Sequence, residues 1–170
     1  MVLGIEALRE TKMETDKEML SNINPSKPSA QHLIPGLYQL AQCWFERGDH
    51  APAEKIYRLI LKIDERTRGI NCGEVVLSSF DLAQLLASTG RYMEAEHQYL
   101  ETLNRCTQVL GQDHPLHALT MNSYSVLLRQ MEFIEEANHV EQRVKETSQD
   151  SQYGHYNSPE KKGIGSQTIC

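Results

Sequence analysis

The feature that most constrains this chain is a pattern of residues that returns, without a gap, after 42 positions. The pattern consists of Leu40-Ala41-Gln42, Gly48, Ala53-Glu54, Tyr57 and Leu61, and it returns as Leu82-Ala83-Gln84, Gly90, Ala95-Glu96, Tyr99 and Leu103. A further step of 42 positions reaches a weaker copy, which keeps Ala137 but begins with Tyr124-Ser125. An internal repeat of this length predicts an array of similar supersecondary units.

The recurring residues predict pairs of helices in close contact. Gly48 and Gly90 break the helical pattern, because glycine readily adopts the left-handed conformation that ends a helix. Small residues on both sides of each break let the two helices approach one another. They are Ala41, Ala83 and Ser125 on the first helices and Ala53, Ala95 and Ala137 on the second helices. A hairpin of this kind cannot bury both of its faces alone, so neighbouring hairpins must stack.

The fold class predicted from this pattern is an all-α solenoid of three hairpins. The helices are expected at about 34–47 and 51–64, at 74–89 and 92–110, and at 116–131 and 134–147, giving an array over residues 34–147 with repeats of about 34–68, 74–110 and 116–147. Residues 1–33 are expected to form an N-terminal helix over 2–20 and a linker, whose two prolines exclude a continuous helix. Residues 148–170 carry few aliphatic side chains and are predicted to be a disordered tail.

Charge and cysteine usage limit the class of protein and its compartment. The net charge of -6 argues against a nucleic-acid binder and against attachment to an anionic membrane, since both use basic surfaces. The sequence shows neither a membrane-spanning apolar run nor a secretory signal in its first ten residues. The four cysteines form no C-x-x-C pair, and Cys43 and Cys106 fall within predicted helices. We therefore expect a soluble, cytoplasmic protein in a reducing compartment.

The order of the recurring residues resembles the tetratricopeptide repeat. The matching positions are Leu40-Ala41, Trp44, Gly48, Ala53 and Tyr57, and then Leu82-Ala83, Leu86, Gly90, Ala95 and Tyr99. The 42-residue period, the turn from Leu110 to Pro115 (LGQDHP) and Asn122 are similar to the kinesin-light-chain-like subtype. In the third copy Glu132 replaces the turn glycine and Glu141 replaces the tyrosine, and Lys145 stands in place of the last leucine. These polar replacements predict that the third repeat ends the array.

The resemblance implies a binding surface on the concave face, which the first helices of the hairpins form. Arrays of this family generally bind an extended or short helical segment of another protein there. From positions three or four apart that lie off the packing face, we predict a peptide-binding set of Tyr38, Gln42, Phe45, Phe80, Gln84, Asn122, Val126 and Arg129, with Ala87 at the position equivalent to Phe45. Rings bury apolar side chains and amides pair with a peptide backbone. Arg129 is the candidate for binding an acidic group.

A structural role is the alternative for each of these residues. Tyr38, Phe45 and Phe80 can pack against neighbouring hairpins instead of contacting a ligand, since scaffold and site share residues on such a fold. The two glutamines and Arg129 can equally be solvated.

Catalysis and metal binding find no support in the motifs. The sequence contains no G-x-S-x-G, phosphate loop or dinucleotide fingerprint, and the carboxylates of the second helices are typical of a solvated face. His114 and His117 lie near Cys106, but no C-x-x-C or H-E-x-x-H pattern accompanies them, and His114 is placed to bond locally before a helix. We expect a protein that is not an enzyme and that uses no cofactor or metal.

Two functions remain open at this point. The first is an adaptor or scaffold that binds a peptide segment of a protein partner on the concave face. The second is a structural assembly module that stacks on another copy, or on a larger helical-repeat protein, through the ends of its array. Neither function involves nucleic acid or a membrane.

Overall fold

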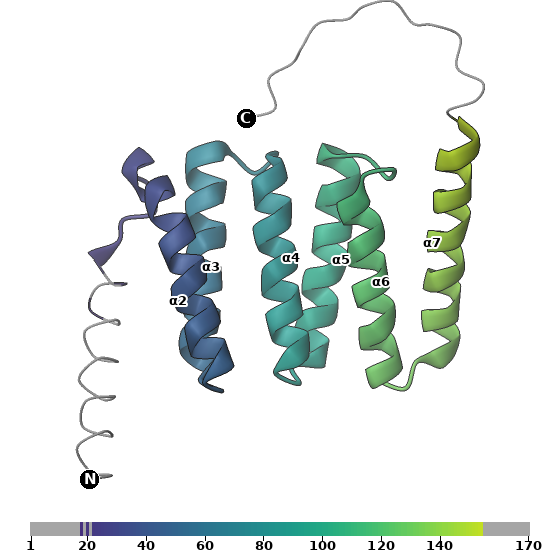
Figure 1. Ribbon diagram of the computed structural model, residues 1–170, viewed down its shortest axis with the longest axis horizontal. Helices are drawn as coiled ribbons and strands as arrows, with labels where there is room; N and C mark the ends of the chain where they lie inside the picture. The colour runs from purple at the N-terminus through teal and green to yellow at the C-terminus, as the bar shows by residue number, and fades with distance from the viewer. Residues whose placement is uncertain (1–17, 19, 21, 155–170) are drawn as a thin grey trace, which may run out of the picture.

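The computed structural model describes Glu18, Leu20 and residues 22–154, and the elements of this part of the chain are all helices joined by turns. A 3-10 helix, η1 (Pro28–Leu33), precedes the α-helices. These are α2 (Ile34–Glu46), α3 (His50–Arg68), α4 (Gly73–Ser88), α5 (Tyr92–Val109), α6 (Pro115–Gln130) and α7 (Ile134–Gly154). The predicted all-α solenoid of three hairpins is confirmed (Figure 1).

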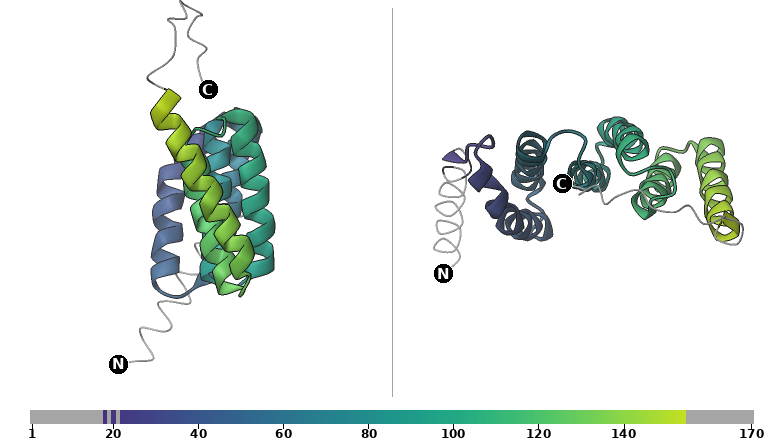
Figure 2. Two further views of the ribbon diagram at one scale, coloured as in Figure 1. Left: turned by 90° about the vertical axis from the view of Figure 1, so that its right-hand side faces the viewer. Right: turned by 90° about the horizontal axis from the view of Figure 1, so that it is seen from above.

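The hairpins α2–α3, α4–α5 and α6–α7 follow one another in chain order along a single row (Figure 1). Each α-helix contacts the next one along the chain, and α4 also contacts α6. Seen from above, the first helices of the hairpins lie toward one side of the row and the second helices toward the other (Figure 2). We call the side formed by α2, α4 and α6 the concave face.

The core lies within the hairpins and continues between them. Trp44 and Ile60 belong to a first cluster in α2 and α3, and Leu86 and Tyr99 to a second cluster in α4 and α5. Leu127 of α6 packs into the second cluster, so the third hairpin completes the core of its neighbour. All the recurring small residues are buried: Ala41, Ala53, Ala83, Ala95, Ser125 and Ala137.

The turns inside the three hairpins share one backbone conformation. The φ angle is 81° at Gly48 and 77° at Gly90, and at Glu132, one period further on, it is 67°. An L-residue in this left-handed region places its Cβ against the following carbonyl oxygen, which costs about 1–2 kcal/mol. The repeat therefore imposes its turn geometry on the third hairpin although the glycine is absent.

Helix α3 continues to Arg68, beyond the end at Asp64 that the apolar pattern predicts. The additional residues are polar, but their side chains are satisfied along the helix. The Thr67 hydroxyl donates to the Ile63 carbonyl at 2.6 Å, and Arg68 pairs with Asp64 at 3.1 Å. Gly69, with φ 88°, then ends the helix.

The two ends of the array also differ from the prediction. The linker contains η1, where Ala30 is buried and Ser26 accepts a hydrogen bond from Arg66 of α3 at 2.8 Å. Helix α7 continues past Ser148 to Gly154, so residues 148–154, which were predicted to belong to the tail, are helical. The predicted helix over residues 2–20 and the rest of the tail lie outside the described residues, apart from Glu18 and Leu20. Among the helices of the described part, none combines the length and the apolar character that crossing a membrane requires.

Candidate functional site

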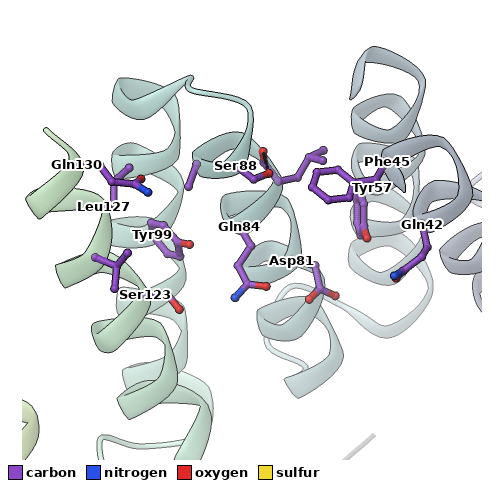
Figure 3. Close-up of a pocket in the computed structure, with 13 residues that line it drawn as sticks. Gln42, Phe45, Tyr57, Asp81, Gln84, Ser88, Tyr99, Ser123, Leu127 and Gln130 are labelled. Carbon is purple, nitrogen blue, oxygen red and sulfur yellow. Dashed lines mark hydrogen bonds between the residues drawn. The ribbon is translucent and has the colours of Figure 1, made fainter. Parts of the chain in front are cut away.

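A pocket of about 480 Å³ lies on the concave face, and all three hairpins contribute to it. We call it the central pocket. It is lined by Gln42, Phe45, Tyr57, Asp81, Gln84, Leu85, Ala87, Ser88, Tyr99, Ser123, Val126, Leu127 and Gln130. Figure 3 shows the labelled residues of α2 and α6 on opposite sides, with Asp81 and Gln84 of α4 between them. Rings, amides and hydroxyls thus surround one carboxylate.

The spacing of the pocket residues along α4 and α6 explains how the concave face is built. Asp81, Gln84 and Ser88 lie three and then four residues apart, so they share one face of α4. One period later, Ser123, Val126 and Gln130 occupy the same face of α6. The predicted set followed positions 38, 42 and 45 and their equivalents, whereas the observed face follows 39, 42 and 46. The pocket lining includes the position of Gln42 in all three hairpins and the position of Phe45 in the first two, but not the position of Tyr38.

Four residues of the predicted set line the central pocket: Gln42, Phe45, Gln84 and Val126. Ala87, the counterpart of Phe45, lines it as well. Tyr38, Phe80, Asn122 and Arg129 do not. Asn122 is exposed on α6 outside the pocket.

The aromatic residues Tyr38 and Phe80 have structural roles. Phe80 is 4% exposed, and its ring centroid lies 6.3 Å from that of Tyr99, inside the second core cluster. Tyr38 stacks edge-on against Tyr57 at 5.9 Å, and its hydroxyl donates to Asp81 Oδ2 at 2.8 Å. For these two residues the packing alternative holds, and Tyr38 ties α2 to α4.

Arg129 is paired within its own hairpin. Its guanidinium donates to both carboxylate oxygens of Glu141 on α7, at 2.9 and 3.0 Å, and to Asn138 at 2.8 Å. The arginine in turn lowers the pKa of the Glu141 carboxyl. The guanidinium is therefore turned toward α7, and the central pocket receives no positive charge from it.

The central pocket is acidic because Asp81 is the one charged residue among those that line it. Burial raises the pKa of the Asp81 carboxyl, and the hydrogen bond from Tyr38 partly offsets this rise. Burial also raises the pKa of Tyr57, and the neighbouring Asp81 charge adds to that rise. Burial raises the pKa of Tyr99 to about 12, so both tyrosines are neutral at physiological pH.

Comparison with known families agrees with this geometry. Residues 74–149, which cover the second and third hairpins, match the model of the tetratricopeptide repeat. Residues 74–149 thus have the sequence pattern of tetratricopeptide repeats. The first hairpin repeats the same residues 42 positions earlier and has the same turn geometry. Repeats of this kind generally mediate protein–protein interaction and are typically non-catalytic scaffolds.

Two similar solved structures share the fold of the array. Both are crystal structures described as kinesin light chain nearly identical TPR-like repeats from Podosopora anserina, one of them a variant. Their TM-scores are 0.65 at 16% sequence identity. The alignments cover 77% and 78% of this chain and 60% and 61% of the other chains. The similarity thus concerns the fold, over about three fifths of each crystal structure.

A curated relative resembles the tetratricopeptide array in sequence. A clustered mitochondria protein homolog from Coccidioides immitis (strain RS) is 24% identical over 137 residues. The aligned region is 75% of this chain but 11% of that protein. The chain therefore corresponds to a small part of that relative.

Most of the polar lining of the central pocket was not predicted from the sequence. Asp81, Ser88, Ser123 and Gln130 were not among the predicted site residues, although the 42-residue spacing relates Asp81 to Ser123 and Ser88 to Gln130. That spacing is the signal that identifies the concave face once its register is known. Tyr57 and Tyr99 were assigned to packing alone, but they also line the pocket. Leu85 and Leu127 form another related pair in the lining.

The histidines considered as metal ligands have local roles in the array. His114 caps α6, since its Nδ1 accepts a hydrogen bond from the Leu116 amide at 3.2 Å. His117 is buried, and this burial lowers the pKa of its imidazole. The described residues contain no group of three or more histidine, cysteine, aspartate or glutamate side chains placed to hold a metal ion.

Proposed function

We propose that this protein is an interaction adaptor or scaffold that binds a peptide segment of another protein in the central pocket. The observation that carries this proposal is the pocket itself, whose volume of about 480 Å³ lies within the range of small-ligand sites. Residues of all three hairpins line it, so a bound segment would run across the array. The family's general role in protein interaction agrees with this function.

The lining suits an extended peptide. Gln84 and Gln130 carry donors and acceptors that pair with the amide groups of a peptide backbone. Gln42 keeps its carbonyl oxygen available, since its Nε2 donates to Glu46 at 3.0 Å. The rings of Phe45 and Tyr57 offer apolar surface for side chains of the segment. The proposed compartment is the cytoplasm.

Stacking through the C-terminal end of the array has less support. Helix α7 buries Ala137 and Val144. Its other side chains include exposed Asn138, His139 and Gln142. A polar outer face is what a capping repeat presents to solvent. The assembly module remains the second candidate, and light scattering of the purified chain at several concentrations separates the two, because the adaptor is expected to be a monomer.

Selection from a phage-displayed library of random peptides tests the adaptor function, with the full chain as bait. The affinity of the selected peptides is then measured by fluorescence anisotropy against two matched variants. Ser88→Trp places an indole in the central pocket, and Thr107→Trp places one on α5 outside it. Both residues are exposed hydroxyls that donate to carbonyls of their own helices, Ser88 to Leu85 and Thr107 to Leu103. The two substitutions therefore perturb the fold to a similar extent.

We expect Ser88→Trp to weaken binding by about tenfold or more and Thr107→Trp to leave it unchanged. Equal affinity for the wild type and Ser88→Trp would show that the peptides bind elsewhere. A library that yields no binder, together with a concentration-dependent mass, would favour the assembly module.

A further inference from the structure

The central pocket holds one formal charge and no counter-charge. Of the 13 residues that line it, Asp81 is the one that is ionised in water, and none is a lysine or an arginine. Two arginines outside the pocket are engaged elsewhere. Arg129 pairs with Glu141, and Arg47 lies over the Trp44 ring at 5.7 Å. A carboxylate in such a hollow lacks the partner that a positive charge would provide.

The Asp81 carboxylate is held in a fixed orientation. Tyr38 donates to its Oδ2, and the Tyr38 hydroxyl also lies 3.4 Å from the Ser78 hydroxyl. Ser78 in turn donates to the buried Asp64 at 2.5 Å. Because the bond from Tyr38 uses Oδ2, the Oδ1 atom of Asp81 retains its capacity to accept a hydrogen bond from a ligand. An oriented acceptor favours a charged donor over water, since less freedom is lost on binding.

The surroundings of Asp81 suit a long cationic side chain. Tyr57 and Phe45 offer partly exposed rings, and positive groups are attracted to the faces of aromatic rings. Gln84 and Ser88 add neutral acceptors on the same helix face as Asp81. On the α6 side, Val126 is 56% exposed and gives the pocket an apolar edge.

We propose that the central pocket selects a lysine or arginine side chain of the bound segment, with its cation on Asp81 and a neighbouring apolar residue against Val126. This inference rests on the proposed function, because it names the chemistry of the segment that the adaptor binds. Charge complementarity supports it, both in the pocket and in the net charge of -6 of the whole chain.

Two small probes isolate the cation from the rest of a peptide. N-acetyl-arginine methylamide carries the guanidinium, and N-acetyl-citrulline methylamide has the same shape with a neutral urea group. Each is titrated into the full-length, isotope-labelled chain, and the amide resonances of α4 are followed by NMR. We expect the arginine probe to shift the resonances around Asp81 and Gln84 and to bind about tenfold more tightly than the citrulline probe.

Three variants complete the test. Asp81→Asn removes the charge but keeps an acceptor for Tyr38, and it should reduce arginine binding to the citrulline level. Asp113→Asn removes the same charge from an exposed turn outside the pocket and should change nothing. Ser123→Asp adds a carboxylate at the equivalent position of α6 and should strengthen arginine binding. The unshifted amide spectra of the α6–α7 hairpin in Asp81→Asn will show that this variant folds.

Equal binding of the two probes, or arginine binding that survives Asp81→Asn, would overturn the inference. The library peptides separate it from the proposed function. Consider selected peptides that contain no lysine or arginine. If Ser88→Trp blocks their binding and Asp81→Asn does not, the adaptor function stands and the proposed selection of a cationic side chain is refuted. Peptides that bind and lose about tenfold in affinity with Asp81→Asn would support both.

Discussion

The two interfaces between hairpins have the same helical arrangement but different chemistry. At the first interface, between α2–α3 and α4–α5, polar groups cross the boundary: Tyr38 to Asp81 and Ser78 to Asp64. One period later, these positions are Phe80, Ser123, Thr120 and Cys106. Phe80 and Cys106 are buried, and Thr120 bonds within its own helix, to the Leu116 carbonyl at 2.6 Å. The second interface is therefore more apolar than the first, although the Tyr124 hydroxyl of α6 donates to Glu96 of α5 across it at 3.1 Å.

The solvent-exposed edges of the two interfaces, which we call their rims, also differ in polarity. Ion pairs join α3 to the second hairpin: Arg91 with Glu54, Arg58 with Glu94 at 3.9 Å, and Arg105 with Glu65 at 2.9 Å. At the second interface, Leu100 takes the place of Arg58 and Phe133 takes the place of Arg91. Both of these apolar side chains are about half exposed.

The comparison shows which residues determine the fold and which distinguish the two interfaces. We call the interface between α2–α3 and α4–α5 the first joint and the interface between α4–α5 and α6–α7 the second joint. The small residues and the turn conformation recur in all three hairpins. The residues between them decide whether a joint is held by directional hydrogen bonds or by apolar contact. Directional bonds fix the orientation of a carboxylate for a ligand, and apolar contact does not.

The largest expected difference in stability concerns Tyr57 and Tyr99, which occupy equivalent positions of the first and second hairpins. Tyr99 is 2% exposed and lies between the rings of Phe80 and Tyr124, so Tyr99→Ala should lower the free energy of unfolding by about 3–5 kcal/mol. Tyr57, its equivalent at the first joint, is only half-buried, and Tyr57→Ala should cost about 1–2 kcal/mol. Urea unfolding followed by circular dichroism measures both. Equal losses would contradict the assignment of the second joint as the more tightly packed one.

The next prediction is a pH dependence confined to the first joint. Burial is the main cause that raises the pKa of Asp64 and of Asp81 above the usual 3.8, although Ser78 and Arg68 oppose it at Asp64 and Tyr38 opposes it at Asp81. The folded state then binds protons more tightly than the unfolded state. These two groups should therefore lower the free energy of unfolding as pH rises from about 3.8 through their raised pKa values.

The double variant Asp64→Asn, Asp81→Asn should lack this contribution. The measurement is the difference between wild type and variant in urea unfolding across that pH range, because other carboxyls cancel in the difference. The hydrogen-exchange protection of α2 and α3 should differ between wild type and variant with the same pH dependence. The protection of α6 and α7 should not differ in this way. A pH-dependent difference in α6 and α7 would contradict the localisation to the first joint.

A smaller effect is expected at the turns, where the hairpins are alike in conformation but not in sequence. Glu132→Gly should raise the free energy of unfolding by about 0.5–1 kcal/mol, because the left-handed strain is removed and part of the gain is offset by glycine's entropy. Gly90→Ala should lower it by about 1 kcal/mol, since an added Cβ meets nothing within 4 Å and the cost is conformational alone. Thermal unfolding of each variant measures its change in stability. A stabilising Gly90→Ala would refute this explanation.

The smallest change in stability is expected for an exchange of the rims. Leu100→Arg with Phe133→Arg places arginines beside Glu96 and Glu136, as at the first joint, and Arg58→Leu with Arg91→Phe makes the reverse change. Exposed ion pairs contribute little to stability, so both pairs of substitutions should shift the thermal midpoint less than the variants above. Binding of a hydrophobic dye should fall in the first double variant and rise in the second. Unchanged dye binding in both would show that the second rim is not an apolar surface.

The sequence was sufficient to predict what the repeat itself encodes. The helix pairs, the buried small residues and the turn at Gly48 and Gly90 follow from letters that recur every 42 positions. It was not sufficient where side chains of different helices meet. The pairing of Arg129 with Glu141 depends on the crossing of α6 and α7, and the extension of α3 to Arg68 depends on polar contacts with no apolar period.

The concave face shows most clearly how precisely the sequence can identify one face of a helix. A change of one position along α4 separates Phe80, which is buried, from Asp81, which lines the central pocket. Helical periodicity identifies a face only to about one residue, because each position turns the side chain by about 100°. Four of the eight predicted site residues therefore line the pocket, and its charged residue was missed.

The hydrogen bond between Tyr38 and Asp81 gives one carboxylate two tasks. It helps to close the first hairpin onto the second, and it lies in the wall of the central pocket. Thermodynamic linkage then requires that a segment which binds the closed joint more tightly also holds that joint closed, by the same free energy. The solenoid is therefore not equally stiff along its length. A ligand on Asp81 would stiffen the first joint through this hydrogen bond, whereas the equivalent positions of the second joint, Phe80 and Ser123, have no such bond.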